Sequence, residues 1–292
     1  MQELFTKRWF RWVIGIIAFV AMFLMASYQR RTGPTWPVPV DETLQGSELS
    51  GELIRTQAGD GDARIAVSLA DEQVQGEVVW RRYPTQDEWS RLVMVRETTD
   101  EGSELAAYLP NQPMAAKLEY SVHLFKGNDE LTLPHDETAV IRFRRDVPAW
   151  VLIPHIVVMF LTLWLVFRAA LGAIFGEIGV RRFIPTILGL LLFGGFFLGP
   201  LVQKYAFDAW WTGWPFGGDW TDNKTLAALI AWLIAWWICR KWPQLQRAAV
   251  LLAAIVMVVV YLIPHSIHGS ELEWEAMEAE ARTTTAPAGR SN

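Results

Sequence analysis

The chain has 292 residues, of which 52% are hydrophobic, and it contains 16 tryptophans. Its net charge of −5 comes without a basic stripe, so nucleic acid is excluded as a partner. The single cysteine, Cys239, excludes an internal disulfide, and the missing Cys-x-x-Cys-His motif excludes covalent c-type haem attachment. The apolar residues gather in segments of membrane-crossing length, which is about 20 residues. We therefore expect an α+β membrane protein.

Five apolar segments are predicted to span a bilayer as helices: residues 12–27, 149–167, 183–202, 225–239 and 248–264. The first segment follows a basic N-terminus, residues 1–11. Its end runs into Tyr28 without a small-residue cleavage motif, so we interpret it as an uncleaved signal anchor.

Basic residues favour the cytoplasmic side of short loops. They precede the first segment and also lie between the second and third and between the fourth and fifth: Lys7, Arg8, Arg11, Arg168, Arg181, Arg182, Arg240, Lys241 and Arg247. All of them fall on one side only if five segments cross. We therefore expect a multi-pass protein of a bacterial-type inner membrane, with a cytoplasmic N-terminus and a periplasmic C-terminus. Arg168 and the nearby Glu177 are interpreted as charges at the cytoplasmic boundary.

A long hydrophilic segment separates the first two predicted spans. Residues 28–45 form a Pro-rich spacer, and residues 46–147 contain alternating runs separated by turn signals. The predicted strands are residues 48–55, 63–69, 77–83, 92–97, 105–109, 117–125 and 139–144. About seven short strands at near-regular spacing are typical of a β-sandwich. We expect this periplasmic sandwich to be inserted between the first and second membrane helices.

Leu109-Pro110, followed by the run Tyr120-Ser121-Val122-His123-Leu124, resembles the E–F corner of immunoglobulin-like and fibronectin type III domains. The resemblance covers residues 46–147 only, and no family is recognised in the membrane half. It implies that Tyr120 bonds back to the preceding turn and that Trp80 packs in the core. It also implies an adhesive or spacer module rather than a catalyst.

Residues 148–268 form the predicted four-helix membrane domain, with a Trp-rich periplasmic loop at residues 203–224. Aromatic side chains favour the membrane interface, so we expect the loop to provide an interface or pocket wall. The residues concerned are Trp210, Trp211, Trp214, Phe216 and Trp220. The glycines of the loop and Pro215 indicate a fixed turn or lid. Gly195 and Gly199 are predicted to allow close helix contact.

The tetrapeptide Leu-Ile-Pro-His occurs twice, at residues 152–155 and 262–265, so Pro154 and Pro264 are predicted structural positions. His155, His265 and His268 lie toward the same membrane boundary. Together with Asp219 and Asp222 they could bind a transition metal, and the histidines could also ligate haem b or contact a quinone. Histidines that simply cap carbonyls freed by proline are the alternative, because the sequence holds no tight ligand pair.

Residues 269–292 are predicted to be an acidic, partly disordered periplasmic tail. No catalytic residues are identified. The leading hypothesis is a non-enzymatic accessory or assembly subunit of an envelope membrane complex. It would contact the lipid bilayer and other membrane or periplasmic proteins through its sandwich and aromatic loop. The alternatives are a membrane redox protein that uses the outer-face histidines and, third, a transporter. The predicted spans carry no central Asp, Glu or Lys, which disfavours the transporter.

Overall fold

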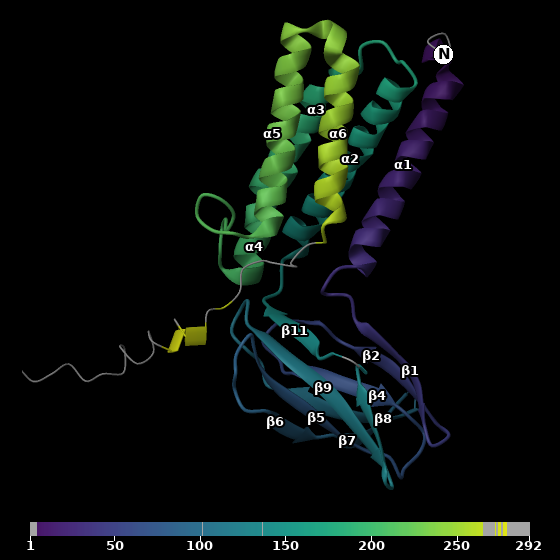
Figure 1. Cartoon of the computed structure of the whole chain (residues 1–292), viewed down its shortest axis with the longest axis vertical. Coiled ribbons are helices and arrows are strands. Elements are labelled where there is room, and N and C mark those ends of the chain that lie inside the picture. The colour runs from purple at the N-terminus through teal and green to yellow at the C-terminus, as the bar shows by residue number, and fades with distance from the viewer. Residues whose placement is uncertain are drawn as a thin grey trace, which may run out of the picture. The chain divides into compact units, whose positions relative to one another are not determined.

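The computed structural model describes residues 5–100, 102–135 and 137–264, together with Leu272, Trp274, Glu275, Met277 and Glu278. These residues divide into two compact units (Figure 1). The membrane-helix unit comprises the described residues up to Trp36 and from Asp146 to Pro264. The sandwich unit comprises Pro37–Arg145 and the described residues from Leu272 onward. The expected mixture of helices and sheets is confirmed.

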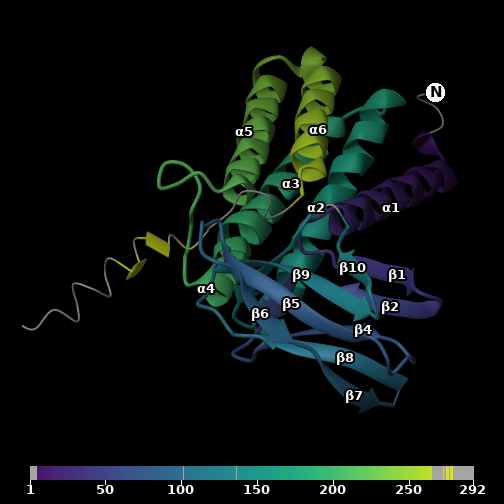
Figure 2. The same ribbon diagram turned by 60° about the horizontal axis from the view of Figure 1, so that its bottom comes forward.

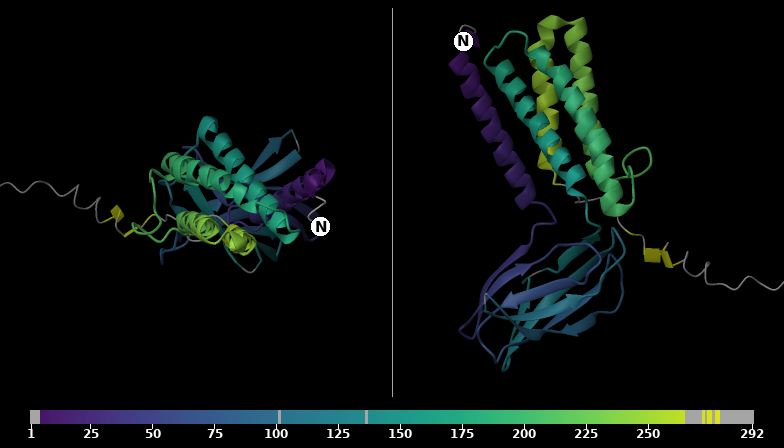
Figure 3. Two further views of the ribbon diagram at one scale, coloured as in Figure 1. Left: turned by 90° about the horizontal axis from the view of Figure 1, so that it is seen from above. Right: turned by 180° about the vertical axis from the view of Figure 1, so that it is seen from behind.

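The helices of the membrane-helix unit run side by side, with their axes roughly aligned (Figures 1 and 3). They are α1 (Arg8–Arg31), α2 (Ala149–Ile174), η2 (Val180–Phe183), α3 (Ile184–Leu191), η3 (Leu192–Leu198), α4 (Gly199–Phe207), α5 (Trp220–Lys241), η4 (Pro243–Leu245) and α6 (Gln246–Leu262). Among the described residues, four stretches are long and apolar enough to cross a membrane: Arg8–Arg31, Ala149–Ile174, Val180–Phe207 and Pro243–Leu262. They cover four of the five predicted spans.

Helix α5 contains the remaining predicted span, residues 225–239, but it does not belong to this set. It has 22 residues, so its length is sufficient. Its first turns carry Asp222 and Lys224, and its last turn carries Arg240 and Lys241. These charges at both ends lower its apolarity. The described residues therefore show four strongly apolar helical stretches, where the sequence predicts five.

Buried apolar side chains from α2, α3, α5 and α6 form one core, in which Trp232 is fully buried. Helix α1 buries only a stripe, formed by Ile14, Ala18, Met22 and Met25. This spacing places the four side chains on one helical face. The indole of Trp164 in α2 also donates a hydrogen bond to the carbonyl of Gly15, at 2.9 Å.

Two glycines let neighbouring helices approach η3, which is a π-helix. A Cβ atom added at Gly194 would lie 2.8 Å from Val158 Cγ1, and one added at Gly195 would lie 2.7 Å from Thr225 Cγ2. Both distances are too short for a real Cβ. The close approach predicted at Gly195 is therefore confirmed, whereas a Cβ at Gly199 would meet only ordinary contacts.

The sandwich unit has two sheets, and most of their strands are labelled in Figure 2. One sheet has the order β1 (Val38–Leu44), β2 (Ser47–Leu53), β4 (Ala63–Ser68), β8 (Gly102–Leu109) and β7 (Val95–Thr99). The other has the order β3 (Thr56–Ala58), β11 (Ala139–Arg144), β9 (Lys117–Lys126), β5 (Gln75–Tyr83) and β6 (Ser90–Val93), and β10 (Asp129–Leu133) pairs with β9. Among the described strands, β3 and β11 pair in parallel and every other pair is antiparallel.

The predicted spacer at residues 28–45 is wrong at both ends. Helix α1 continues to Arg31, and β1 begins at Val38. Strand β1 buries Val40 and Leu44 in the sandwich core, so the segment is an edge strand despite Pro39. An edge strand tolerates proline because one side of its backbone makes no ladder bonds.

Tyr120 is fully buried in β9, and burial raises its pKa above the ordinary value. Its hydroxyl donates to the carbonyl of Ile54, between β2 and β3, at 2.8 Å. The predicted bond to the turn that precedes β9 is therefore wrong, because the tyrosine instead bonds a carbonyl far away in the sequence. Trp80 is half-buried and packs against the sandwich core.

The described part of the C-terminal segment packs on the sandwich. Trp274 is 6% exposed and donates its indole N–H to the carbonyl of Tyr83, at 3.2 Å. The guanidinium of Arg82 lies 5.0 Å from the Trp274 ring centroid and donates to the Glu278 carboxylate, at 2.6 Å. This portion of the predicted tail is therefore docked, whereas most of residues 269–292 lie outside the described residues.

Candidate functional site

The connection between α4 and α5 is fixed by the carboxylate of Asp222, which is itself buried. Its Oδ2 atom accepts hydrogen bonds from the backbone N–H groups of Thr212 and Gly213, at 2.7 and 3.1 Å. Asn223 Oδ1 accepts a third, from the N–H of Trp214 at 2.7 Å. Asp219 caps α5 and accepts from the Thr221 N–H at 2.7 Å. The loop is thus anchored on the first turn of the helix that follows it.

Two glycines make this anchoring possible. A Cβ atom at Gly213 would lie 2.6 Å from Asp222 Cβ, and one at Gly217 would overlap the carbonyl oxygen of Thr212. Neither overlap can be relieved by rotating a long side chain. This agrees with a fixed turn.

Four exposed aromatic side chains, three in this loop and one at the first residue of α5, are here called the aromatic plate: Trp210, Trp214, Phe216 and Trp220. Their exposed fractions range from 47% to 83%. Trp211 behaves differently, because it is half-buried and stacks on Phe196 of η3, with the ring centroids 5.4 Å apart. Its indole also donates to the carbonyl of Trp214, at 3.1 Å. Of the five predicted interface residues, the structure therefore presents four outward and uses the fifth to hold the loop.

His155 lies in α2, and its Nδ1 atom is 3.0 Å from the carbonyl of Gly194 in η3. Because a carbonyl can only accept, Nδ1 carries the proton and Nε2 keeps its lone pair. His265 and His268 lie outside the described residues. Within the part of the chain that the structure describes, no three His, Cys, Asp or Glu side chains form a metal-binding group. The metal and haem sites predicted from the sequence therefore stay predictions.

The two Leu-Ile-Pro-His segments differ in the structure. Pro154 lies inside α2, which continues to Ile174, whereas Pro264 comes just after α6 ends at Leu262. The carbonyls of Ile263 and Pro264 accept hydrogen bonds from the Nζ atom of Lys224, at 2.8 and 3.1 Å. A lysine from α5, which the sequence analysis does not single out, therefore binds the carbonyls at the end of α6.

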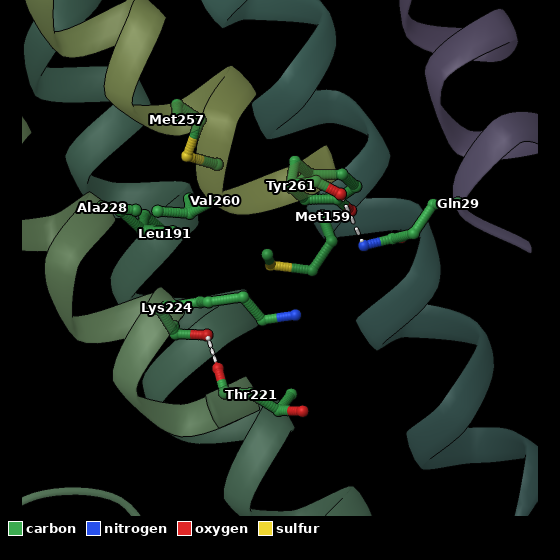
Figure 4. A pocket seen from close by; sticks show the side chains of 10 residues that line it. Gln29, Met159, Leu191, Thr221, Lys224, Ala228, Met257, Val260 and Tyr261 are labelled. Atoms are coloured by element: carbon green, nitrogen blue, oxygen red, sulfur yellow. Dashed lines mark hydrogen bonds between the residues drawn. The ribbon is translucent and has the colours of Figure 1, made fainter. Parts of the chain in front are cut away.

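Lys224 also lines a small cavity of about 30 Å³ within the membrane-helix unit (Figure 4). The lining residues are Gln29, Met159, Leu191, Thr221, Lys224, Thr225, Ala228, Met257, Val260 and Tyr261. They come from α1, α2, α3, α5 and α6. Gln29 closes one side by donating to the carbonyl of Tyr261, at 2.9 Å. The cavity therefore has polar lining residues from α1, α5 and, at Tyr261, α6, and its other lining side chains are apolar.

A second buried polar group joins α2 to the segment that follows it. Arg168 and Glu177 are both buried, and two hydrogen bonds of 2.6 and 3.2 Å join them. The more exposed Arg182 also pairs with the Glu177 carboxylate. Arg168 and Glu177 thus form a buried ion pair, and their position at the cytoplasmic boundary stays a prediction.

Comparison of the chain with protein-family models, with curated proteins and with solved structures found no match.

Proposed function

We propose that α5 is a fifth membrane-spanning helix. The described chain leaves the sandwich unit at Arg145 and packs on it again from Leu272, where the Leu272 N–H donates to the Ala115 carbonyl at 3.3 Å. The number of crossings between these points must therefore be even. Helix α2, the run Val180–Phe207 and α6 provide three. Helix α5 is the natural fourth, because its outer surface exposes apolar side chains: Ile230, Leu233, Ile234, Trp236 and Trp237.

The basic residues support an orientation with the N-terminus in the cytoplasm and the sandwich and C-terminus in the periplasm of a bacterial-type inner membrane. A green fluorescent protein fused after Asn292 is expected to stay dark, and alkaline phosphatase at the same place to be active. Fluorescence at that position, with inactive phosphatase, would contradict both the orientation and the fifth span.

The strand order supports an immunoglobulin-like sandwich. The order β2-β4-β8-β7 corresponds to strands A-B-E-D of that fold, and β11-β9-β5-β6 corresponds to G-F-C-C′. The parallel pairing of β3 with β11 is explained if strand A of the fold is divided between the two sheets, with β2 in one sheet and β3 beside strand G in the other. Such sandwiches serve many functions. The fold favours binding over catalysis by analogy with other sandwich domains, and the function has to be argued from the site.

The function that this geometry supports best is that of an accessory or assembly subunit, which binds other membrane or periplasmic proteins. The observation that carries it is the aromatic plate held on a fixed loop. Rigid, exposed tryptophan is the side chain that protein interfaces use most effectively, because little conformational entropy is lost on binding. Contact with lipid headgroups is the competing role for the same side chains.

Mild solubilisation followed by crosslinking and mass spectrometry tests this function. The wild type is expected to co-purify with a stoichiometric membrane or periplasmic protein, and the double variant Trp214→Ala/Phe216→Ala to lose it. The matched control is Trp12→Ala/Phe23→Ala, which removes side chains of the same types and similar exposure from α1. Isolation of the wild type as a lone monomer, or equal loss in both double variants, would refute a binding role for the plate.

A second candidate function is favoured by His155. Its Nδ1–H bond to a backbone carbonyl is the arrangement that orients a histidine for ligation through Nε2. Haem b, a transition metal or a quinone would be the ligand. Visible spectra and metal analysis of the purified chain test it. A cofactor band that disappears in His155→Ala would support this candidate, and a colourless, metal-free wild type would end it for haem and metals.

A further inference from the structure

Among the residues that the structure describes, Lys224 is a buried cation whose charge no ion pair balances. It is 8% exposed, and its ammonium donates to the carbonyls of Ile263 and Pro264. An ammonium has three N–H donors, so one remains after these two bonds. No carboxylate among the described residues pairs with it, although the charge of Asp219 acts on it from the helix cap. Carbonyl oxygens satisfy donors but do not neutralise a charge, and a buried charge without a partner is costly.

The cavity beside Lys224 offers space for a partner. Figure 4 shows the lysine side chain extending toward this space from α5, between Met159 and Thr221. Thr225 and Gln29 add further polar groups, while Leu191 and Met257 provide apolar walls. A volume of about 30 Å³ exceeds the room that one water needs. A single water would also satisfy the third N–H without balancing the charge.

We propose that this cavity binds an anionic oxygen group, a phosphate or carboxylate, on a lipid-soluble molecule, with Lys224 donating its third N–H to that group. The apolar walls fit the part of such a molecule that adjoins its head. The site also lies near the start of α5, directly after the aromatic plate, and tryptophans of this kind favour the depth at which lipid headgroups lie. A bilayer phospholipid carries such a group, and a free anion in solution, which shares its chemistry, is separated from it by the test.

The test compares lipid retention by the full-length protein in nanodiscs made from equal parts of phosphatidylglycerol and phosphatidylcholine. Native mass spectrometry is expected to show that the wild type retains phosphatidylglycerol preferentially. Lys224→Met should lower this preference about tenfold, the effect of losing one charged hydrogen bond. Lys224→Arg should keep most of it. The control is Lys204→Met, which removes an exposed lysine that already pairs with Asp208 at 2.5 Å.

Two further arms keep the test decisive. Ala228→Val fills part of the cavity and leaves Lys224 itself unchanged, so it should also reduce retention even if Lys224→Met folds poorly. Inorganic phosphate added to discs of phosphatidylcholine alone distinguishes the source: a rise in the thermal midpoint of the wild type but not of Lys224→Met assigns the site to a free anion. No preference for phosphatidylglycerol together with no phosphate effect would overturn the proposal. Equal retention of phosphatidylglycerol, together with an equal phosphate-induced shift of the thermal midpoint, in the wild type and Lys224→Met would also overturn it. Lys224 would then have only the role of capping α6.

Discussion

Replacing Glu177 should be among the most damaging single changes in the membrane-helix unit. Glu177 is 3% exposed and is the shared partner of two arginines, the buried Arg168 and the more exposed Arg182. Glu177→Gln would leave the Arg168 guanidinium buried without a counter-charge. Removing one partner of a buried ion pair costs about 3–5 kcal/mol, because the remaining charge keeps its desolvation penalty.

The geometry also predicts that replacing Arg168 costs less stability than replacing Glu177. In Arg168→Met the carboxylate of Glu177 keeps its pair with Arg182, so the expected cost is only about 1–2 kcal/mol. The double variant Arg168→Met/Glu177→Gln should recover most of the loss seen in Glu177→Gln, since the unpaired buried charge is gone. Equilibrium unfolding in mixed micelles, followed by tryptophan fluorescence, measures all four proteins.

Gly172 provides an independent check of the same cluster. A Cβ atom there would lie 2.5 Å from Glu177 Oε2 and 3.0 Å from Arg168 Nη1. Gly172→Ala should therefore destabilise the protein, although alanine favours a helix by about 1 kcal/mol. Gly189→Ala is the control, because no atom lies within 4 Å of its added Cβ. A loss below about 1 kcal/mol in Glu177→Gln, or equal effects of the two glycine variants, would refute the reasoning.

Three other changes have defined outcomes. Gly213→Ala should cost about 1–3 kcal/mol and speed amide hydrogen exchange in the aromatic loop, because its Cβ would overlap that of Asp222. Tyr120→Phe should lower the thermal midpoint by an amount equivalent to about 1–2 kcal/mol, since a buried carbonyl loses its donor. Hydrogen bonding to Lys126 holds the pKa of Asp71 below its ordinary value, so the stability that Asp71 contributes is present above pH 3.8 and is lost as the pH falls. The midpoint of Asp71→Asn should consequently fall less than that of the wild type between about pH 5 and pH 2.

Apolar segments and alternating strands could be predicted because each is imposed by its surroundings. A bilayer requires a long apolar run, and a half-buried sheet requires a period of two. The prediction of one strand at residues 92–97 was wrong. The structure divides it at Met94 into β6 and β7, which lie in different sheets. Alternation within six residues cannot reveal a change of sheet, because it depends on which strands become neighbours.

Lys224 could not be predicted as a site residue for a physical reason. The predicted span began at residue 225, which excluded Lys224 from the helix, whereas α5 begins at Trp220 under the cap of Asp219. A charged residue at the start of an apolar helix is a signal in itself, since such residues need a partner. The partner carbonyl of Ile263 lies 39 residues away, however, and only the folded chain brings it within reach.

The duplicated Leu-Ile-Pro-His segment shows why local sequence leaves the site undetermined. In α2, Pro154 follows the helix start closely, so its missing N–H deprives only the Trp150 carbonyl of a helical partner, and the helix continues. At the end of α6, which the structure places at Leu262, the carbonyls of Ile263 and Pro264 accept hydrogen bonds from an ammonium of α5. Identical residues thus have different roles: one segment lies inside a helix, and the carbonyls of the other bind Lys224. The difference comes from the position of each proline relative to its helix end and from the side chain that the fold places there.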